Sequence, residues 1–372
     1  MSNPLLNKHD LHEVASLFDM RGDLVLGYPY GSGHINDTYC AHYDQAGLRI
    51  RYIHQRINHD IFQDPAGLME NISRVTEHAL KGLVAAGDKE AFRRTLTCLP
   101  AKTGKPYAVD SQGNHWRTYL FIERARTYDI LETPAQAKEA ARAFGEFQKL
   151  GADLPGKPLI ETIPDFHNTK QRFNNLLAAI EADTHNRAAS VKSEIDWFLS
   201  RQDDAKLVVD ALDSGEIPVR VTHNDTKLNN VMLDDVTGEA VCVIDLDTTM
   251  PGSAIYDFGD MVRTATSPAA EDEPDTSKID CREEFFEALV SGYLSSAKDF
   301  LTDRERDLLA FSGKLLTLEC GTRFLADYLQ GDTYFKTHRD GHNLDRCRTQ
   351  IALVEAIEGK MSTLEALVAK YA

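Results

Sequence analysis

The sequence has no long hydrophobic run: nowhere do roughly eighteen apolar residues follow one another, so we expect no membrane-spanning helix. Residues 1–26 also lack the basic start and apolar stretch of a secretory signal. The six cysteines are scattered, without a Cys-x-x-Cys pair or a His spacing suited to zinc. Together these absences predict a protein of the reducing cytoplasm with no membrane partner.

Basic residues are in the minority. Lys and Arg number 41 against 58 Asp and Glu, which gives a net charge of −17. A surface of this sign repels the phosphate backbone of nucleic acids, so we expect no nucleic-acid partner. ATP is not excluded, because a glycine-rich loop and a bound cation can dominate the field within one site.

Length and patterning predict two lobes. The 372 residues exceed the roughly 100–200 residues of one domain. Strand-like segments come first, at 24–30, 35–43, 48–57, 95–100 and 116–122, with a helix that starts near Pro65. The pattern changes from strand-like to helical at 123–127. We therefore predict an α+β, bilobal fold: a β-rich nucleotide-binding lobe (1–124), a hinge, and a catalytic, substrate-binding helical lobe (125–372).

Helical periodicity dominates the second part of the chain. It predicts helices at 135–150, 168–183, 188–201 and 307–329. Short strands are predicted within this part at 218–221, 231–233 and 241–244, and the turn-forming residues 234–238 join the last two into a hairpin.

Two motifs flank this hairpin. Before it, residues 223–230 read His-x-Asp-x-x-x-x-Asn, with Asp225 and Asn230 at the fixed positions. After it, Asp245 follows a continuous apolar strand. This is the layout of a kinase catalytic loop and its metal-binding aspartate. The pair of motifs predicts phosphoryl transfer from ATP with Mg²⁺.

The residue types suit that chemistry. Asp225 can hold the acceptor hydroxyl and accept its proton, which contributes roughly 10²- to 10⁴-fold in rate. Asn230 and Asp245 offer the oxygen ligands that Mg²⁺ prefers. Lys227 can offset charge on the transferring phosphoryl group. The alternative, that these are solvated turn residues, does not account for the spaced Asn, the hairpin and the second Asp together.

Two further residues have expected structural roles. We expect His223 to anchor the catalytic loop rather than to act as an acid or base. Asp257 is expected to fix the same loop by accepting hydrogen bonds from its backbone N–H groups.

A glycine-rich segment precedes these motifs by some 190 residues. Gly31, Ser32 and Gly33 lie between two predicted strands. Glycines here either permit positive φ in a hairpin or let backbone N–H groups approach phosphates. Because the order matches that of a bilobal kinase, we interpret this segment as nucleotide-binding.

The third predicted strand has no lysine to contact the phosphates. Arg56 is the first candidate for that contact and Gln55 the second, since alternate residues face opposite sides of a strand. Glu70 or Glu77 on the following helix would then pair with Arg56, or either could be a solvated helix residue.

Five segments together resemble the N-acetylhexosamine 1-kinases, within the aminoglycoside phosphotransferase and choline kinase group. They lie at 33–39, 55–58, 166–169, 223–230 and 244–248. The resemblance implies a protein kinase-like fold. It also implies transfer of the ATP γ-phosphate to the anomeric hydroxyl of N-acetylglucosamine or N-acetylgalactosamine.

The same resemblance names two sugar-binding candidates. Arg323 lies with Glu319 and Asp327 at i, i+4 spacing on one helix face; such a row could also be an ordinary ion-pair ladder. Resemblance of this segment to the hexosamine kinases makes Arg323 a sugar ligand. His34 is a second candidate, from the opposite lobe.

Other functions remain open. The same fold could act on an aminoglycoside, choline, homoserine or the 6-hydroxyl of a hexosamine. A nucleotide-binding scaffold without activity is disfavoured, because Asp225, Asn230 and Asp245 are all present. The sequence does not reveal the oligomeric state, and we assume a monomer.

Overall fold

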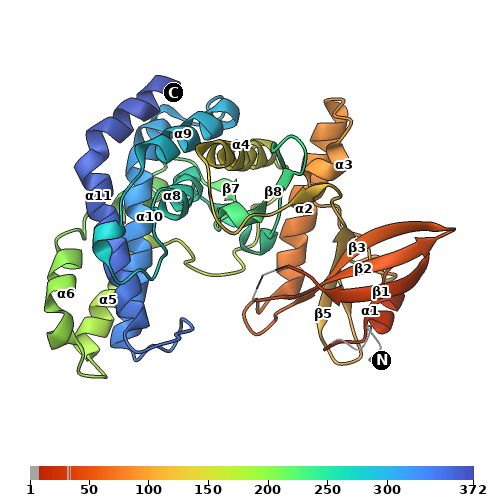
Figure 1. The fold of residues 1–372 in the computed structure, drawn as a ribbon, viewed down its shortest axis with the longest axis horizontal. Coiled ribbons are helices and arrows are strands. Elements are labelled where there is room, and N and C mark those ends of the chain that lie inside the picture. Colours follow the sequence, from red (N-terminus) through yellow and green to blue (C-terminus); the bar gives the residue numbers. More distant parts are fainter. Residues whose placement is uncertain (1–7, 32, 34) are drawn as a thin grey trace.

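The computed structural model describes residues 8–31, 33 and 35–372. It has the predicted α+β architecture, with an antiparallel sheet at one end of the molecule and a mainly helical part at the other (Figure 1). Among the described residues, no helix is both long and apolar enough to cross a membrane.

The N-terminal sheet has five strands in the order β1-β2-β3-β5-β4. Their bounds are β1 (Asp23–Pro29), β2 (Asp37–Gln45), β3 (Leu48–Ile57), β4 (Ala108–Val109) and β5 (His115–Leu120). The strand predicted at 95–100 is wrong: only an isolated bridge joins Cys98 to Tyr119 there. Sequence periodicity also missed a short helix, α1 (Leu11–Leu17), which packs on Trp116 of the sheet.

The helix predicted from Pro65 is α2 (Pro65–Ala85), followed by the short α3 (Ala91–Arg94). Asp64 caps α2 by accepting a hydrogen bond from the Gly67 N–H. Its buried face, including Leu68 and Ile72, belongs to the same hydrophobic cluster as the core of the helical part. Helix α2 therefore shares the core of the helical part, whereas most buried residues of the sheet form clusters of their own.

The predicted hairpin is present as β8 (Val231–Asp234) and β9 (Ala240–Val243), and β6 (Ala125–Arg126) extends it in the order β6-β8-β9. Beside it, β7 (Arg220–Thr222) pairs with β10 (Met250–Gly252). The chain leaves the large sheet at Leu120 and joins the small one at Ala125, on either side of the predicted lobe boundary.

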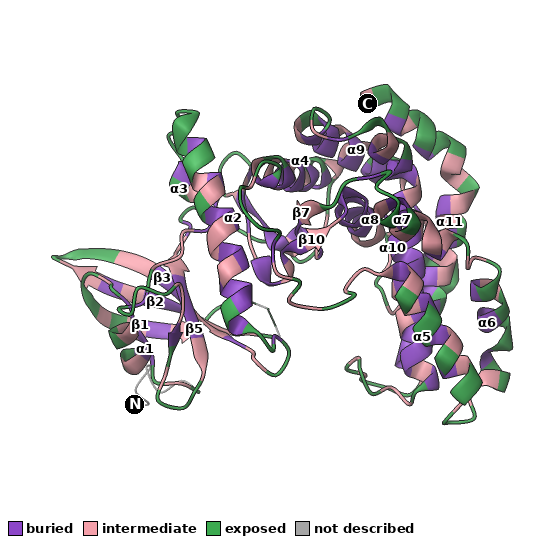
Figure 2. Ribbon diagram, turned by 180° about the vertical axis from the view of Figure 1, so that it is seen from behind, coloured by how far each residue is buried: buried purple, intermediate pink, exposed green. Residues whose placement is uncertain are grey.

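The helical part surrounds one long central helix, α10, which is buried along most of its length (Figure 2). The helices are α4 (Pro134–Gly151), α5 (Thr169–Ala182), α6 (Lys192–Leu199), α7 (Asp204–Asp213), α8 (Ala254–Ala265), α9 (Glu283–Ala297), α10 (Asp303–Leu329) and α11 (His342–Tyr371). Thr133 and Thr302 start α4 and α10 with capping boxes. These helices support the small sheets that carry the predicted catalytic motifs.

Candidate active site

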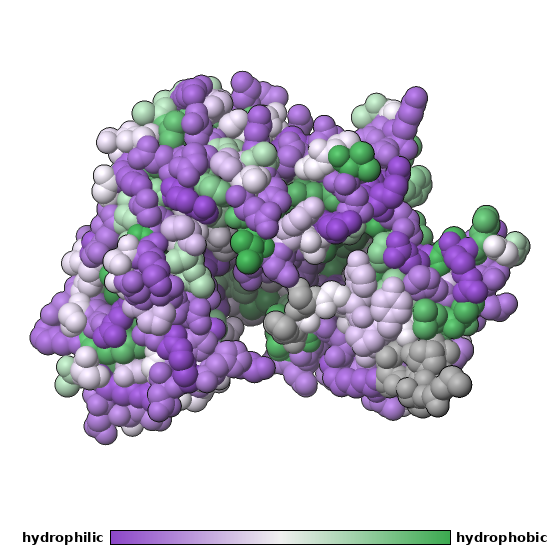
Figure 3. Space-filling view, viewed as in Figure 1, coloured by the Kyte–Doolittle hydropathy of each residue, from purple (hydrophilic) through white to green (hydrophobic). Residues whose placement is uncertain are grey.

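Several of the predicted site residues meet in a cleft between the large sheet and the helical part, where the surface is hollowed (Figure 3). Gly33 and Gln55 line it from the sheet side. Asp225, Asn230 and Asp245 line it from the other. Residues about 200 positions apart in the sequence therefore share one pocket.

The loop after β7 is held by a buried carboxylate. Asp257 on α8 is fully buried and accepts hydrogen bonds from the backbone N–H groups of His223 (2.9 Å) and Asn224 (2.7 Å). Asn224 has a left-handed φ of 64°, which these bonds stabilise. This is the role predicted for Asp257.

His223 lies in the core rather than in the cleft. Its Nε2 donates to the Ile244 carbonyl oxygen at 2.9 Å, and its Nδ1 accepts from the Asp225 N–H at 3.3 Å. The ring joins the catalytic loop to the segment after β9 that carries Asp245. His223 therefore anchors the loop, as expected.

Asp225 faces the cleft with two hydrogen-bonding neighbours. Lys227 Nζ lies 2.8 Å from Oδ1, and Asn230 Nδ2 lies 3.1 Å from Oδ2. The Asp225 side chain is 28% exposed, so a small acceptor can reach it. The carboxylate is held in one orientation yet open to a hydroxyl group, as a general base must be.

Asn230 and Asp245 fit a Mg²⁺ site. The Asn230 amide donates its Nδ2 to Asp225, which leaves Oδ1 as its ligand atom. Asp245 has a left-handed φ of 58° and is exposed to the open cleft. Surrounding protein atoms and then the nearby Asp247 carboxylate nonetheless raise the pKa of Asp245 to about 6. A carboxylate in this setting gains from a bound cation, and one amide and one carboxylate oxygen suit a hard ion.

The glycine segment lies above this pocket. Gly31 has φ of 84°, and a Cβ at Gly31 or Gly33 would meet no atom within 4 Å. Gly31 and Gly33 both line the cleft. The predicted positions Ser32 and His34 lie outside the described residues.

The structure corrects the expected role of Arg56. Its Nε lies 2.6 Å from the Asp37 Oδ2, and it does not line the described cleft pockets. Gln55, the second choice, does line them, because it faces the opposite side of β3. Burial opposes ionisation of Asp37, but the hydrogen bond from Arg56 leads those that lower its pKa to about 2.

The cation nearest the cleft on the sheet side is Arg117, on β5. It pairs in register with Gln55 and donates to its Oε1 from Nε (2.8 Å) and Nη2 (2.6 Å). Its Nη1 forms an ion pair with Asp247, which also accepts from Asn36 Nδ2 at 2.5 Å. Arg117 is 4% exposed and Asp247 is equally buried, so this pair joins the sheet to the catalytic hairpin.

The expected partners of Arg56 on α2 are also corrected. Glu70 pairs with Lys157 at 2.9 Å, and Glu77 lies 3.9 Å from Lys81. Both glutamates are on solvated positions of the helix, which was the alternative interpretation.

Arg323 lies on α10 in a second pocket. Its guanidinium carbon is 5.3 Å from the centre of the Phe335 ring and 5.8 Å from that of Tyr334. Arg172 of α5 lines the same pocket. The alternative interpretation, an ion-pair ladder, does not hold: Glu319 contacts His167, while Asp327 accepts hydrogen bonds from the backbone N–H groups of 333–335.

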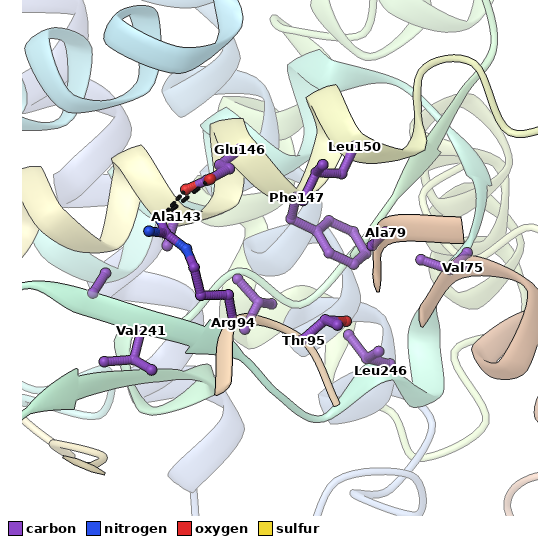
Figure 4. A pocket seen from close by; sticks show the side chains of 12 residues that line it. Val75, Ala79, Arg94, Thr95, Ala143, Glu146, Phe147, Leu150, Val241 and Leu246 are labelled. Carbon is purple, nitrogen blue, oxygen red and sulfur yellow. Dashed lines mark hydrogen bonds and ion pairs between the residues drawn. The ribbon is translucent and has the colours of Figure 1, made fainter. Parts of the chain in front are cut away.

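A separate small hollow lies between α2, α4 and β9 (Figure 4). Its walls are mostly apolar, and an ion pair of Arg94 with Glu146 (2.9 Å) crosses its edge. None of the predicted site residues lines it.

Sequence reasoning missed Arg117 and His167. Arg117 is the one arginine or lysine in its strand, which could have signalled a buried ion pair. For His167 the sequence offers only its place in the segment 166–169 of the resemblance.

The arrangement defines a class of protein. Asp257 holds the loop that carries Asp225 and Asn230. The hairpin that follows leads to Asp245, which lines the same pocket, and glycines between β1 and β2 of the N-terminal sheet line it from the other side. This is the site of a kinase-like phosphotransferase. Residues 28–306 match the phosphotransferase enzyme family, APH. The chain belongs to that family.

Solved structures with the same fold include an aminoglycoside phosphotransferase from Alicyclobacillus acidocaldarius. It superposes with a TM-score of 0.57 at 12% identity, over 100% of this chain and 98% of its own. A spectinomycin phosphotransferase in complex with ADP and spectinomycin has a TM-score of 0.46 at 14% sequence identity, over 92% of this chain and 94% of its own. A choline kinase from Streptococcus pneumoniae has a TM-score of 0.47 at 15% sequence identity, over 91% of this chain and 94% of its own.

Proposed function

We propose that the protein transfers the γ-phosphate of ATP to the anomeric hydroxyl of an N-acetylhexosamine, N-acetylglucosamine or N-acetylgalactosamine. Asp225 holds that hydroxyl and accepts its proton. Asn230 and Asp245 hold Mg²⁺, which when bound neutralises charge on the phosphates. Lys227 offsets charge on the transferring group, and Gly31 and Gly33 lie over the nucleotide.

The observation that carries the catalytic part is the Asp225 environment. Lys227 Nζ at 2.8 Å and Asn230 Nδ2 at 3.1 Å fix both oxygens of the carboxylate at the floor of the cleft. A residue held this way can align a hydroxyl for in-line attack without reorganising. On the sheet side, we assign the phosphate-facing polar contacts to Gln55 and Arg117 in place of Arg56.

We assign the acceptor to the second pocket, whose lining favours a neutral, hydroxyl-rich substrate. Arg172 and Arg323 both line it, and burial and then the charge of Arg323 lower the pKa of Arg172. Among the described residues, neither arginine has a carboxylate within ion-pair distance. Two cations repel a polycationic aminoglycoside or choline, whereas guanidinium groups donate readily to sugar hydroxyls and an acetamido oxygen.

The second candidate is another hydroxyl acceptor on the same fold. The net charge of −17 favours a cationic one, such as an aminoglycoside, in the long-range field. Homoserine and the hexosamine 6-hydroxyl belong to the same alternative. All six cysteines are unpaired, and we place the reaction in the cytoplasm, where ATP and thiols coexist.

The test is ³¹P NMR of the products formed with Mg-ATP and each N-acetylhexosamine. A sugar phosphate resonance coupled to the anomeric proton is the expected result. Coupling to a C6 proton would move the reaction to the 6-hydroxyl. If neither sugar is phosphorylated while choline, homoserine or an aminoglycoside is, the N-acetylhexosamine assignment is wrong.

A further inference from the structure

A buried histidine connects α10 to the peptide that precedes Asp225. His167, just before α5, has Nδ1 3.0 Å from Glu319 Oε1 and Nε2 3.0 Å from the carbonyl oxygen of Asn224. The side chains of His167 and Glu319 are 10% and 2% exposed. These contacts come from segments 152 and 57 residues away in the sequence.

The partners determine where the protons lie. A carbonyl oxygen only accepts, so the Nε2 of His167 must donate to Asn224. A second proton must lie between Nδ1 and Glu319, since otherwise two lone pairs would face each other. The Oε2 of Glu319 has no hydrogen-bond partner among the described residues, so His167 is the group that compensates this buried carboxyl.

The carbonyl in question belongs to the peptide that carries the Asp225 nitrogen. Asp257 holds the N–H of Asn224 at 2.7 Å on one side of this residue. His167 holds its C=O on the other. The left-handed backbone of Asn224 is therefore held at both its N–H and its C=O. These two contacts also fix the orientation of the next residue, Asp225.

We propose that His167 and Glu319 form a positioning pair that orients Asp225 through the Asn224 carbonyl, and that this orientation is lost when the pair gives up its shared proton. The proposal rests on Asp225 being the base of the proposed function. His167 lines none of the described cleft pockets, so in this proposal it acts only through the loop.

Removal of the shared proton breaks one of the two contacts. The neutral ring then has a single N–H, which can serve Asn224 or Glu319 but not both. Burial lowers the pKa of His167, but the Glu319 charge and hydrogen bond outweigh it, so the net direction is upward. The pair therefore loses its proton as pH rises, and later than an isolated histidine would. Three other charged or titratable groups face the pair, namely Asp260 and Tyr256 on α8 and Arg172 on α5.

Two near-isosteric variants separate the contacts. In His167→Gln the amide nitrogen can reach the Nε2 position and donate to Asn224. In His167→Asn the amide reaches only the Nδ1 position, so Asn224 loses its donor. We expect His167→Asn to lower kcat roughly tenfold with KM for ATP unchanged, because one hydrogen bond to the loop is lost. His167→Gln should keep kcat within about threefold.

The pH profile supplies the second readout. Glu319→Gln replaces the shared proton with an amide donor, so a neutral ring can serve both partners at every pH. We expect the fall of kcat at alkaline pH in the wild type to be absent in Glu319→Gln. Equal kcat for His167→Asn and His167→Gln, or an alkaline limb that survives Glu319→Gln, would overturn the proposal.

The kinetics use whichever acceptor is phosphorylated, or hydrolysis of Mg-ATP by water if none is. Independently of turnover, ¹⁵N NMR of the wild-type protein labelled at histidine should show both ring nitrogens of His167 protonated at pH 7. An unprotonated Nε2 contradicts the pair itself. Failure of the proposed function would instead appear as full activity of Asp225→Asn, so the two failures are distinct. A thermal melt of each variant verifies folding.

Discussion

At the scale of the residue, the site combines a reactive carboxylate with buried groups that do no chemistry. Asp225 is partly open to the cleft, while Asp257 and His223 behind it are fully buried. Buried polar groups are costly unless each is satisfied. Asp257 and His223 are satisfied because they form hydrogen bonds with the backbone of the catalytic loop and of the segment after β9, and these bonds position Asp225.

The first prediction concerns Asp225 itself. Asp225→Asn keeps the size and the contact with Lys227 but cannot accept the acceptor proton. We expect kcat to fall by roughly 10²- to 10⁴-fold, with ATP affinity nearly unchanged. Steady-state kinetics and nucleotide titration measure the two quantities. Turnover within severalfold of the wild type would mean that another group is the base.

The sequence predicted the candidate chemical residues and two of their supports, Asp257 and His223, but not Arg117. Asp225, Asn230 and Asp245 follow from spacing alone, because the motif is local and the chemistry limits the choice. Arg117 could not be found in this way. Its partners Gln55 and Asp247 depend on strand register and on how two sheets meet, which local patterns do not encode.

At the scale of the element, the helix starts marked by proline were predictable, and one short segment was not. Pro65 after Asp64 marks the start of α2, and Thr133 before Pro134 that of α4. By contrast, 95–100 reads as a strand but forms only a bridge. Tertiary pairing, not propensity, decides such short segments.

Close packing of α8 against α10 yields the second prediction. A Cβ at Gly259 would overlap the Ser312 carbonyl oxygen, whereas one at Gly359 on the exposed face of α11 would meet nothing within 4 Å. Gly259→Ala should therefore destabilise the protein by about 1–3 kcal/mol. The matched Gly359→Ala should stabilise it by about 0.5–1 kcal/mol through helix propensity.

Chemical denaturation of both variants measures these effects. Because α8 carries Asp257 and Asp260, which hold the catalytic loop, Gly259→Ala should also lower activity. Equal stability of the two variants would show that the helices shift apart without cost, contrary to the tight contact between them.

At the scale of the whole molecule, the large sheet and the helical part are joined by apolar and by ionic contacts. The apolar contact is made by Ile57 at the end of β3, which belongs to the same hydrophobic cluster as Phe144 of α4. The ionic join is the buried pair of Arg117 with Asp247, supplemented by Asn36. The sequence predicted two lobes but not this connection, since its members are 130 and 211 residues apart.

The third prediction tests that connection. Asp247→Asn leaves the Arg117 charge buried without its partner, which should cost about 3–5 kcal/mol. Calorimetry without nucleotide or Mg²⁺ should show a lower unfolding midpoint. The surface pair of Arg126 with Asp235 is the control, and Asp235→Asn should leave the midpoint unchanged, because exposed pairs contribute little.

The double variant Asp247→Asn/Arg117→Met decides whether the loss comes from the unpaired charge. Replacing a buried pair by groups of similar volume is often nearly neutral, so the double variant should recover most of the stability that Asp247→Asn loses. No recovery would mean that Asp247 stabilises the protein chiefly through Asn36 and the hairpin. In that case Asn36→Ala alone should reproduce the loss, and the sheet would be held by that hydrogen bond rather than by the ion pair.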